Sequence, residues 1–150
     1  MKKITSIVLS LFLVAMAATG CGSSTNNDQQ SGGTSGGSSS GFEIALITDK
    51  GNIDDKSFNQ GSWEGVVEFA TANGISHKYY KPEEASDAGY LAAIDLAVTG
   101  GAKVIVTPGY LFEVPIYEAQ TKYPDVKFIL LDGAPHTADY STYETKENVA

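Results

Sequence analysis

Short apolar runs alternate with segments of helical periodicity over residues 42–150. Three continuous apolar runs each predict a buried strand, and the weaker run at 77–80 predicts a fourth. The predicted strands are 42–48 (FEIALIT), 77–80, 103–107 (KVIVT) and 126–131 (VKFILL). Apolar residues at helical spacing predict three helices, at 58–72, 87–98 and 111–122. Residues 148–150 are typical of the start of a fifth strand.

Strands that alternate with helices favour an α/β fold with a doubly wound parallel sheet. In such a sheet ligands bind beyond the carboxyl ends of the strands, near the switch in strand order. Polar or glycine positions follow three of the predicted strands: Asp49, then 108–110 (PGY), then 132–133 (DG). The sequence therefore predicts a ligand site to which all three contribute.

The first twenty residues have the pattern of a secretory signal peptide. A short basic start (1–3) precedes an apolar run, and small residues at 18–20 come directly before Cys21, the chain's only cysteine. The apolar run is shorter than the roughly 20 residues that a transmembrane helix needs. We therefore expect a lipoprotein signal peptide at 1–20, with cleavage before Cys21 and lipid attached to its thiol.

Residues 21–41 follow with almost no core-forming side chains. Six Gly and seven Ser occur between 22 and 41, a composition typical of a flexible tether. We expect this segment to hold the domain 42–150 at the outer face of the cell membrane. With Cys21 acylated, no cysteine remains for a disulfide, so the domain depends on its core alone.

The charge balance narrows the possible partners. Ten Lys and no Arg oppose eighteen acidic residues, for a net charge of −8. Nucleic acid is an unsuitable partner, because its binding depends on neutralising phosphates. Bidentate phosphate recognition is chiefly the work of Arg. A neutral or cationic ligand is favoured.

The loop after the first predicted strand, 48–57 (TDKGNIDDKS), lacks the signatures of the common reactive sites. It has one glycine where a phosphate loop needs several, and its carboxylates lack the spacing of a calcium loop. His77 and His136 are isolated in the sequence, and no GxSxG motif is present. We therefore expect no catalytic residue, no metal and no cofactor.

Recognition of a neutral ring compound fits this loop better. Phe58 opens the first helix, where an exposed ring could stack on a ligand; the alternative is a core position. Asn59 offers donors and an acceptor, and the alternative is a helix cap. Asp49 could accept hydrogen bonds from ring N–H groups. We expect Ser57 or Asp55 to cap the helix.

These residues resemble a known family. Thr48-Asp49, 54–60 (DDKSFNQ) and Trp63-Glu64-Gly65 are similar to the signature of the basic membrane protein family, PnrA-like nucleoside-binding lipoproteins of ABC transporters. The resemblance covers essentially all of 43–150, with Asn52 standing where members commonly carry a second glycine. It implies the first lobe of a two-lobed fold of the type I periplasmic-binding-protein kind, with the second lobe absent from this chain.

The resemblance also implies residue roles. Phe58 would stack on a purine, while Asp49 and Asn59 would hydrogen-bond the base. Gly109 would let the backbone approach the ligand, and Asp132 would contact the ligand or the hinge side. The implied partners are a nucleoside and an ABC permease, with no reaction catalysed. A sugar or signal ligand, or a nucleoside-processing lipoprotein enzyme, are the alternatives.

Overall fold

The computed structural model describes residues 43–150. The predicted signal peptide (1–20), Cys21 and the tether lie outside the described residues. Within 43–150 no helix is long and apolar enough to cross a membrane. The strands are β1 (Glu43–Ile47), β2 (Ser76–Tyr80), β3 (Ala102–Pro108) and β4 (Lys127–Leu131). The helices are α1 (Phe58–Asn73), α2 (Asp87–Thr99) and α3 (Glu113–Lys122), with a 3₁₀ turn, η1 (Tyr110–Phe112), before α3.

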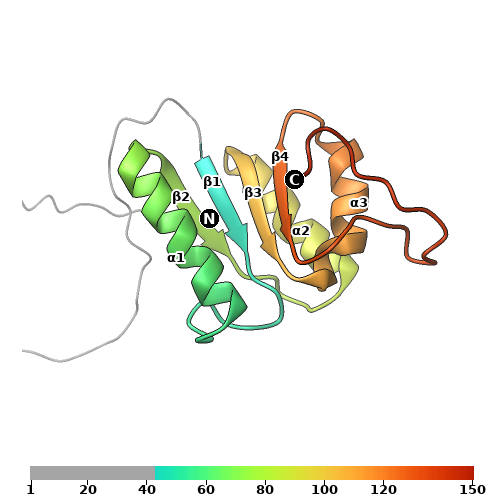
Figure 1. Ribbon diagram of the computed structural model, residues 1–150, viewed down its shortest axis with the longest axis horizontal. Coiled ribbons are helices and arrows are strands. Elements are labelled where there is room, and N and C mark those ends of the chain that lie inside the picture. Colours follow the sequence, from blue (N-terminus) through green and yellow to red (C-terminus); the bar gives the residue numbers. More distant parts are fainter. Residues whose placement is uncertain (1–42) are drawn as a thin grey trace, which may run out of the picture. The chain divides into compact units, whose positions relative to one another are not determined.

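The four strands form one parallel sheet in the order β2-β1-β3-β4. The α/β fold with a parallel sheet is therefore confirmed. From β1 the chain moves outward through α1 to β2, then returns past β1 through α2 to β3 (Figure 1). Because crossovers of this kind are right-handed, the reversal places α1 and α2 on opposite faces of the sheet.

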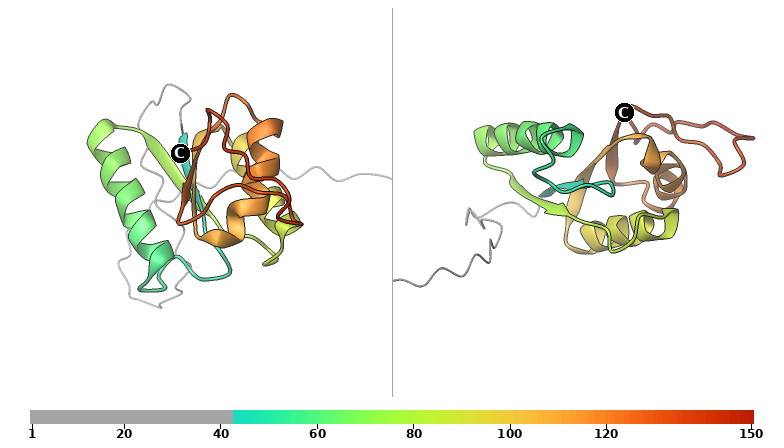
Figure 2. Two further views of the ribbon diagram at one scale, coloured as in Figure 1. Left: turned by 45° about the vertical axis from the view of Figure 1, so that its right-hand side comes forward. Right: turned by 90° about the horizontal axis from the view of Figure 1, so that it is seen from below.

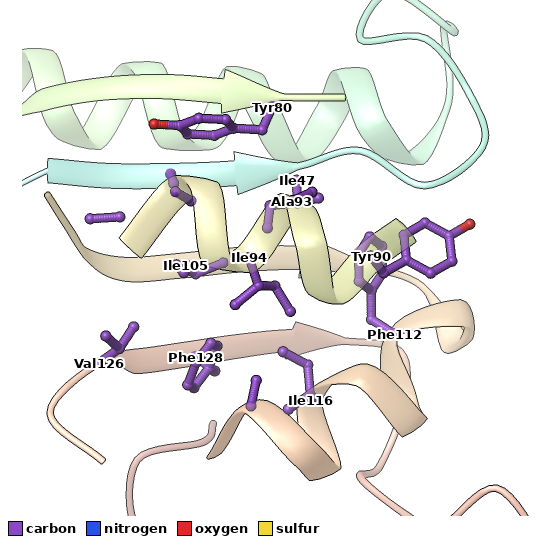
Figure 3. Packing of buried hydrophobic residues seen from close by; sticks show 14 of the residues in the cluster. Ile47, Tyr80, Tyr90, Ala93, Ile94, Ile105, Phe112, Ile116, Val126 and Phe128 are labelled. Atoms are coloured by element: carbon purple, nitrogen blue, oxygen red, sulfur yellow. The ribbon is translucent and has the colours of Figure 1, made fainter. Parts of the chain in front are cut away.

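Each face of the sheet carries its own core. Side chains of β1 alternate, so that Ala45 and Ile47 join the cluster under α2 and α3, while Ile44 and Leu46 join the cluster under α1. The right-hand view of Figure 2 shows α1 on one side of the sheet and the other two helices on the opposite side. Figure 3 shows the larger cluster, in which Ile94 and Phe128 are buried. Burial on both faces explains the continuous apolar runs of the strands.

The helix ends follow the local sequence. Helix α1 ends at Gly74, whose left-handed φ of 64° a glycine adopts without strain. The third helix was expected from residue 111, but a 3₁₀ turn occupies 110–112 and α3 begins at Glu113. Pro115 lies in the first turn of α3, where a missing N–H costs nothing.

The chain beyond β4 returns to the sheet. Phe128 and Val149 form a parallel bridge, and Ala150 N–H donates to Phe128 O at 2.9 Å. The predicted start of a fifth strand at 148–150 therefore pairs with β4. Asn148 Nδ2 donates to the carbonyls of Gln120, Tyr123 and Val126, which fixes this return against the end of α3.

Candidate ligand-binding site

The site predicted at the carboxyl ends of the strands coincides with the switch in strand order. β1 and β3 are neighbours in the sheet, yet the chain leaves them toward opposite faces. The loop after β1 and the loop after β3 therefore begin side by side, which is the usual ligand position in open α/β sheets.

Asp49, directly after β1 and its extension at Thr48, is held in a fixed orientation. Its Oδ1 accepts hydrogen bonds from Gly51 N–H at 2.6 Å and from Asn59 Nδ2 at 2.7 Å. Its own N–H donates to Asn59 Oδ1 at 3.1 Å. Oδ1 is thus bound by the protein, and Oδ2 takes part in none of the hydrogen bonds found in residues 43–150. Asp49 can offer this oxygen as an acceptor.

Asn59 is the centre of this network rather than a surface group. Its side chain is buried, and its second Nδ2 hydrogen donates to Asp55 Oδ2 at 2.9 Å. Both amide hydrogens are therefore used by Asp49 and Asp55. The contact of Asn59 with a ligand stays a prediction. The hydrogen bonds show that its side chain holds the Asp49 carboxylate in place.

Asp55 caps α1. Its Oδ1 accepts from Ser57 N–H at 2.8 Å and from Gln60 N–H at 3.1 Å, whereas the Ser57 side chain makes no capping bond. Burial raises the pKa of Asp55, but the hydrogen bonds from Gln60, Ser57 and Asn59 outweigh it and lower the pKa overall. Because a carboxylate of the chain already occupies this helix N-terminus, an anionic ligand is disfavoured there.

Phe58 lies at the start of α1 and is 44% exposed, so the core position considered from the sequence does not hold. Gly109, just after β3, has φ 106° and ψ 160°, a conformation essentially restricted to glycine. A Cβ at Gly109 would lie 4.0 Å from Phe58 Cδ1. The backbone of the loop after β3 thus passes beside the Phe58 ring, at the carboxyl edge of the sheet.

Asp132 is also at this edge, though by a less direct connection. It follows β4, has a left-handed φ of 59°, and its side chain is exposed. Gly109 N–H donates to Leu131 O at 2.8 Å, which joins the loops after β3 and β4. The structure therefore brings Asp49, Phe58, Asn59 and Gly109 together, with Asp132 on the adjoining loop. Cys21 lies outside the described residues.

Sequence reasoning missed several residues of this edge. Gly51 has no Cβ where one would lie 2.6 Å from Asn59 Nδ2 and 3.0 Å from Asp49 Oδ1. A lone glycine in a polar loop gave no signal of that contact. Thr48 Oγ1 and the Tyr90 hydroxyl are buried and have no hydrogen-bond partner within residues 43–150. Tyr90 falls within the predicted helix 87–98, whose apolar spacing gave no signal for its hydroxyl.

A second polar cluster lies beyond β4. His136 is buried, and its Nε2 lies 3.1 Å from Glu113 Oε2 in the first turn of α3. Its Nδ1 donates to Thr137 O at 2.7 Å, and its ring stacks on Tyr140 at 4.3 Å. The bond to the Thr137 carbonyl, together with Glu113, raises the pKa of His136 despite its burial. This cluster ties the segment after β4 to α3.

Two further points bear on the chemistry of the site. Residues 43–150 contain no group of three or more side chains that could hold a metal ion.

Trp63, part of the 63–65 motif named in the sequence analysis, is half-buried. It packs in the core under α1 and against His77, with 5.5 Å between the ring centroids. The edge of the sheet thus carries the exposed ring of Phe58, the oriented carboxylate of Asp49 and the Gly109 backbone beside the Phe58 ring.

Comparison with known families gives a match over the whole of the described chain. Residues 42–150 match the family model described as "ABC transporter substrate-binding protein PnrA-like". A "CD4+ T-cell-stimulating antigen" of Listeria monocytogenes is 35% identical over 137 residues, which cover 88% of this chain and 38% of that protein. The ABC transporter nucleoside-binding protein BmpA of Lactococcus lactis is 28% identical over 94 residues, covering 60% of this chain and 26% of BmpA.

Solved structures agree on the fold. An ABC transporter solute-binding protein from Aeropyrum pernix K1 superposes with a TM-score of 0.60 and 27% identity, covering 72% of this chain and 27% of that structure. The chain thus spans well under half the length of the curated relatives it matches, and it corresponds to one lobe of the solute-binding fold.

Proposed function

The chain belongs to the family of PnrA-like ABC transporter substrate-binding proteins, and from this premise we propose that it forms the base-binding lobe of a nucleoside receptor. The protein captures a purine nucleoside outside the cytoplasm and delivers it to an ABC permease. It is anchored to the cell membrane through lipid on Cys21, and it performs no chemistry on the ligand.

The observation that carries this proposal is that the exposed ring of Phe58 directly precedes Asn59, the residue whose side chain orients the Asp49 carboxylate. Phe58 is exposed beside Gly109, so a flat ring can stack on it without displacing core residues. Asn59 and Gly51 hold Asp49 Oδ1, which leaves Oδ2 to accept from a ring N–H. An aromatic face with an adjacent acceptor suits a nucleobase.

The charge of the edge supports a nucleoside over a nucleotide. Asp55 occupies the N-terminus of α1, and the Ser86 hydroxyl accepts from Gly89 N–H at the start of α2. The N-termini of α1 and α2 are therefore used by the chain's own oxygens. Asp49 and Asp132 add negative charge that would repel a phosphate.

Sequence beyond this chain would complete the site. Two-lobed binding proteins enclose their ligand between lobes that close about a hinge. In our proposal residues 43–150 supply the wall with Phe58, Asp49 and Gly109, and Asp132 contacts the ligand or borders the hinge. The second lobe would supply the opposite wall and the contacts to the sugar.

Calorimetry on the full-length protein, including any sequence that follows Ala150, tests the proposal. We expect inosine or another purine nucleoside to bind with a Kd in the micromolar range or below, and the matching 5′-monophosphate and free ribose to bind at least tenfold more weakly. Preference for a sugar would support the sugar-binding alternative instead. Chromatography of the same mixtures should show intact nucleoside, because release of free base would identify an enzyme.

Delivery to a permease has its own test. Cells that lack the gene should take up radiolabelled inosine more slowly, and the wild-type gene should restore the rate. A variant gene encoding Phe58→Ala should restore it only in part. Unchanged uptake in the deleted strain would contradict transport while leaving nucleoside binding intact.

A further inference from the structure

Both ring nitrogens of His136 face hydrogen-bond acceptors. Nδ1 lies 2.7 Å from the Thr137 carbonyl oxygen, and Nε2 lies 3.1 Å from Glu113 Oε2. A carbonyl and a carboxylate can only accept, whereas a neutral imidazole has one N–H donor and one acceptor nitrogen. The neutral ring therefore satisfies one of these contacts, and only the protonated ring satisfies both. The raised pKa of His136, to which the Thr137 carbonyl contributes most, agrees with a protonated ring.

The surroundings of this ring favour its charged form. The His136 side chain is 3% exposed, so little water can replace a missing hydrogen bond. Tyr140 stacks on the imidazole with the centroids 4.3 Å apart, and Tyr143 packs at 5.0 Å. The faces of aromatic rings attract a cation. The charged groups that act on the ring from other elements are Glu113 at the start of α3 and Asp87 at the start of α2, and both are acidic.

Glu113 joins the loop after β4 to the first turn of α3. Its Oε1 accepts from Ala134 N–H at 3.0 Å, while Oε2 accepts from His136. A Cβ at Gly133 would lie 3.0 Å from Glu113 Cγ, so the same side chain also packs on the backbone there. Gly133, Ala134 and His136 thus all contact one carboxylate side chain. Asp132, with its left-handed φ of 59°, directly precedes them.

This junction borders the ligand edge. Gly109, whose backbone passes beside the Phe58 ring, donates its N–H to Leu131 O at 2.8 Å. Glu113 follows Gly109 by one short 3₁₀ turn, and it holds the residues after Asp132. The loops after β3 and β4 are therefore joined at two points, and Figure 1 shows the segment after β4 passing beside α3. Loss of the second joint would let Asp132 shift relative to the loop after β3.

We propose that His136 and Glu113 form a proton-dependent latch that holds the loop after β4 on α3, and that nucleoside binding at the carboxyl edge is strongest while His136 is protonated. The choice of ligand rests on the proposed function, whereas the latch rests on the contacts of residues 133–137. Deprotonation removes one of the two N–H donors of the ring. The latched loop is then less populated, and the apparent affinity falls with that population. Affinity is therefore highest at low pH and falls as pH rises through the raised pKa of His136.

Calorimetry of the full-length protein with inosine measures this coupling. Between about pH 5.5 and about pH 8, which spans the titration of a histidine, we expect the wild-type affinity to fall about 3- to 10-fold, as for one hydrogen bond. His77→Gln removes the other of the chain's two histidines and is the matched control. It should show the same fall as the wild type.

Glu113→Gln is the decisive variant. Its amide can donate to a neutral His136 Nε2 and still accept from Ala134 N–H, so the latch closes without the proton. We expect its affinity for inosine to stay constant or to rise over the same pH range. His136→Gln should bind at every pH about as weakly as the wild type does at high pH. A fall with pH in Glu113→Gln equal to that of the wild type would overturn the proposal.

Hydrogen exchange in the ligand-free wild type tests the latch without any nucleoside. The protection factor of Ala134 N–H should fall as pH rises through the pKa of His136, whereas that of Gly109 N–H should stay constant. Constant protection at Ala134 would overturn the latch. A pH-dependent latch with pH-independent inosine affinity would overturn its coupling to binding. Wild-type protein that binds no nucleoside would overturn the proposed function, while the exchange result would still decide the latch.

Discussion

Asn59 and Asp49 are joined by two reciprocal hydrogen bonds. Asn59 Nδ2 donates to Asp49 Oδ1 at 2.7 Å, while Asn59 Oδ1 accepts from Asp49 N–H at 3.1 Å. The first residue of the post-β1 loop is thereby tied, both by side chain and by backbone, to the first turn of α1. Because carboxylate orientation decides which ligand groups can donate to it, this pair would set what the proposed site recognises.

Replacement of Asn59 should act through Asp49. We expect Asn59→Ala to lower the stability of the protein by about 1–3 kcal/mol, because Asp49 and Asp55 lose a buried donor, and to weaken nucleoside binding. In the Asp49→Ala background the same change should cost little further affinity. A double-mutant cycle measured by calorimetry checks this. Additive losses would instead show a direct contact between Asn59 and the ligand.

Gly51 should tolerate no side chain. Gly51→Ala would place a Cβ 2.6 Å from Asn59 Nδ2 and 3.0 Å from Asp49 Oδ1. We expect a stability loss of about 1–3 kcal/mol from this overpacking, together with at least a several-fold loss of affinity. Gly61→Ala in α1 is the matched control, since its Cβ would meet nothing within 4 Å. In that helix position alanine should be neutral or stabilising by about 0.5–1 kcal/mol. Thermal melts and calorimetry of both variants measure the difference.

Phe58 should contribute to affinity more than to stability. Stacking of a base on an aromatic ring is worth roughly 1–3 kcal/mol by alanine substitution in single-strand binders. Phe58→Ala in the full-length protein should therefore weaken nucleoside binding about 5- to 150-fold, with a small change in melting temperature. Phe69, also on α1 and 57% exposed, is the control, and Phe69→Ala should bind normally. A large drop in melting temperature with affinity preserved would return Phe58 to a packing role.

The stability of the fold should depend on pH through His136. Its pKa is raised above the ordinary value of 6.5 by the Thr137 carbonyl and by Glu113. The folded protein therefore binds this proton more tightly than the unfolded chain. Its stabilising effect is complete below about pH 6.5 and is lost as pH rises through the raised pKa. Melting temperatures from pH 5.5 to 8.5 should show this loss in the wild type and in His77→Gln, but less of it in His136→Gln. Identical pH profiles for all three proteins would contradict the role of His136.

Cys21 should carry the lipid. Cys21→Ser should abolish incorporation of radiolabelled palmitate and release the protein from the membrane fraction. A diacylated cysteine supplies the two chains that stable anchoring requires, whereas one chain binds only marginally. Fractionation and labelling of cells that express either form measure both effects. Retention of the serine variant in the membrane would indicate an uncleaved anchor instead.

The sequence by itself determined the architecture of residues 43–150. Buried parallel strands need apolar side chains on both faces, so the runs at β1, β3 and β4 were visible as continuous apolar segments. Helical spacing and the glycine at the end of α1 located the helices to within a few residues. The order of these elements also placed Asp49, Gly109 and Asp132 after strands, because that depends only on chain connectivity.

Only the tertiary structure decided what those side chains do. The helical period was compatible with Phe58 either in the core or exposed to a ligand. Its exposure beside Gly109 depends on the path of the β3 loop past α1. The contact of Asn59 with a ligand stays a prediction, and only the structure shows that Asp49 and Asp55 converge on its amide from two points of the loop. The unpaired hydroxyl of Tyr90 could not be read from an apolar helix face. Hydrogen bonds between distant segments depend on loop geometry, which hydrophobic patterning does not encode, whereas burial and helical period are local properties that the sequence records directly.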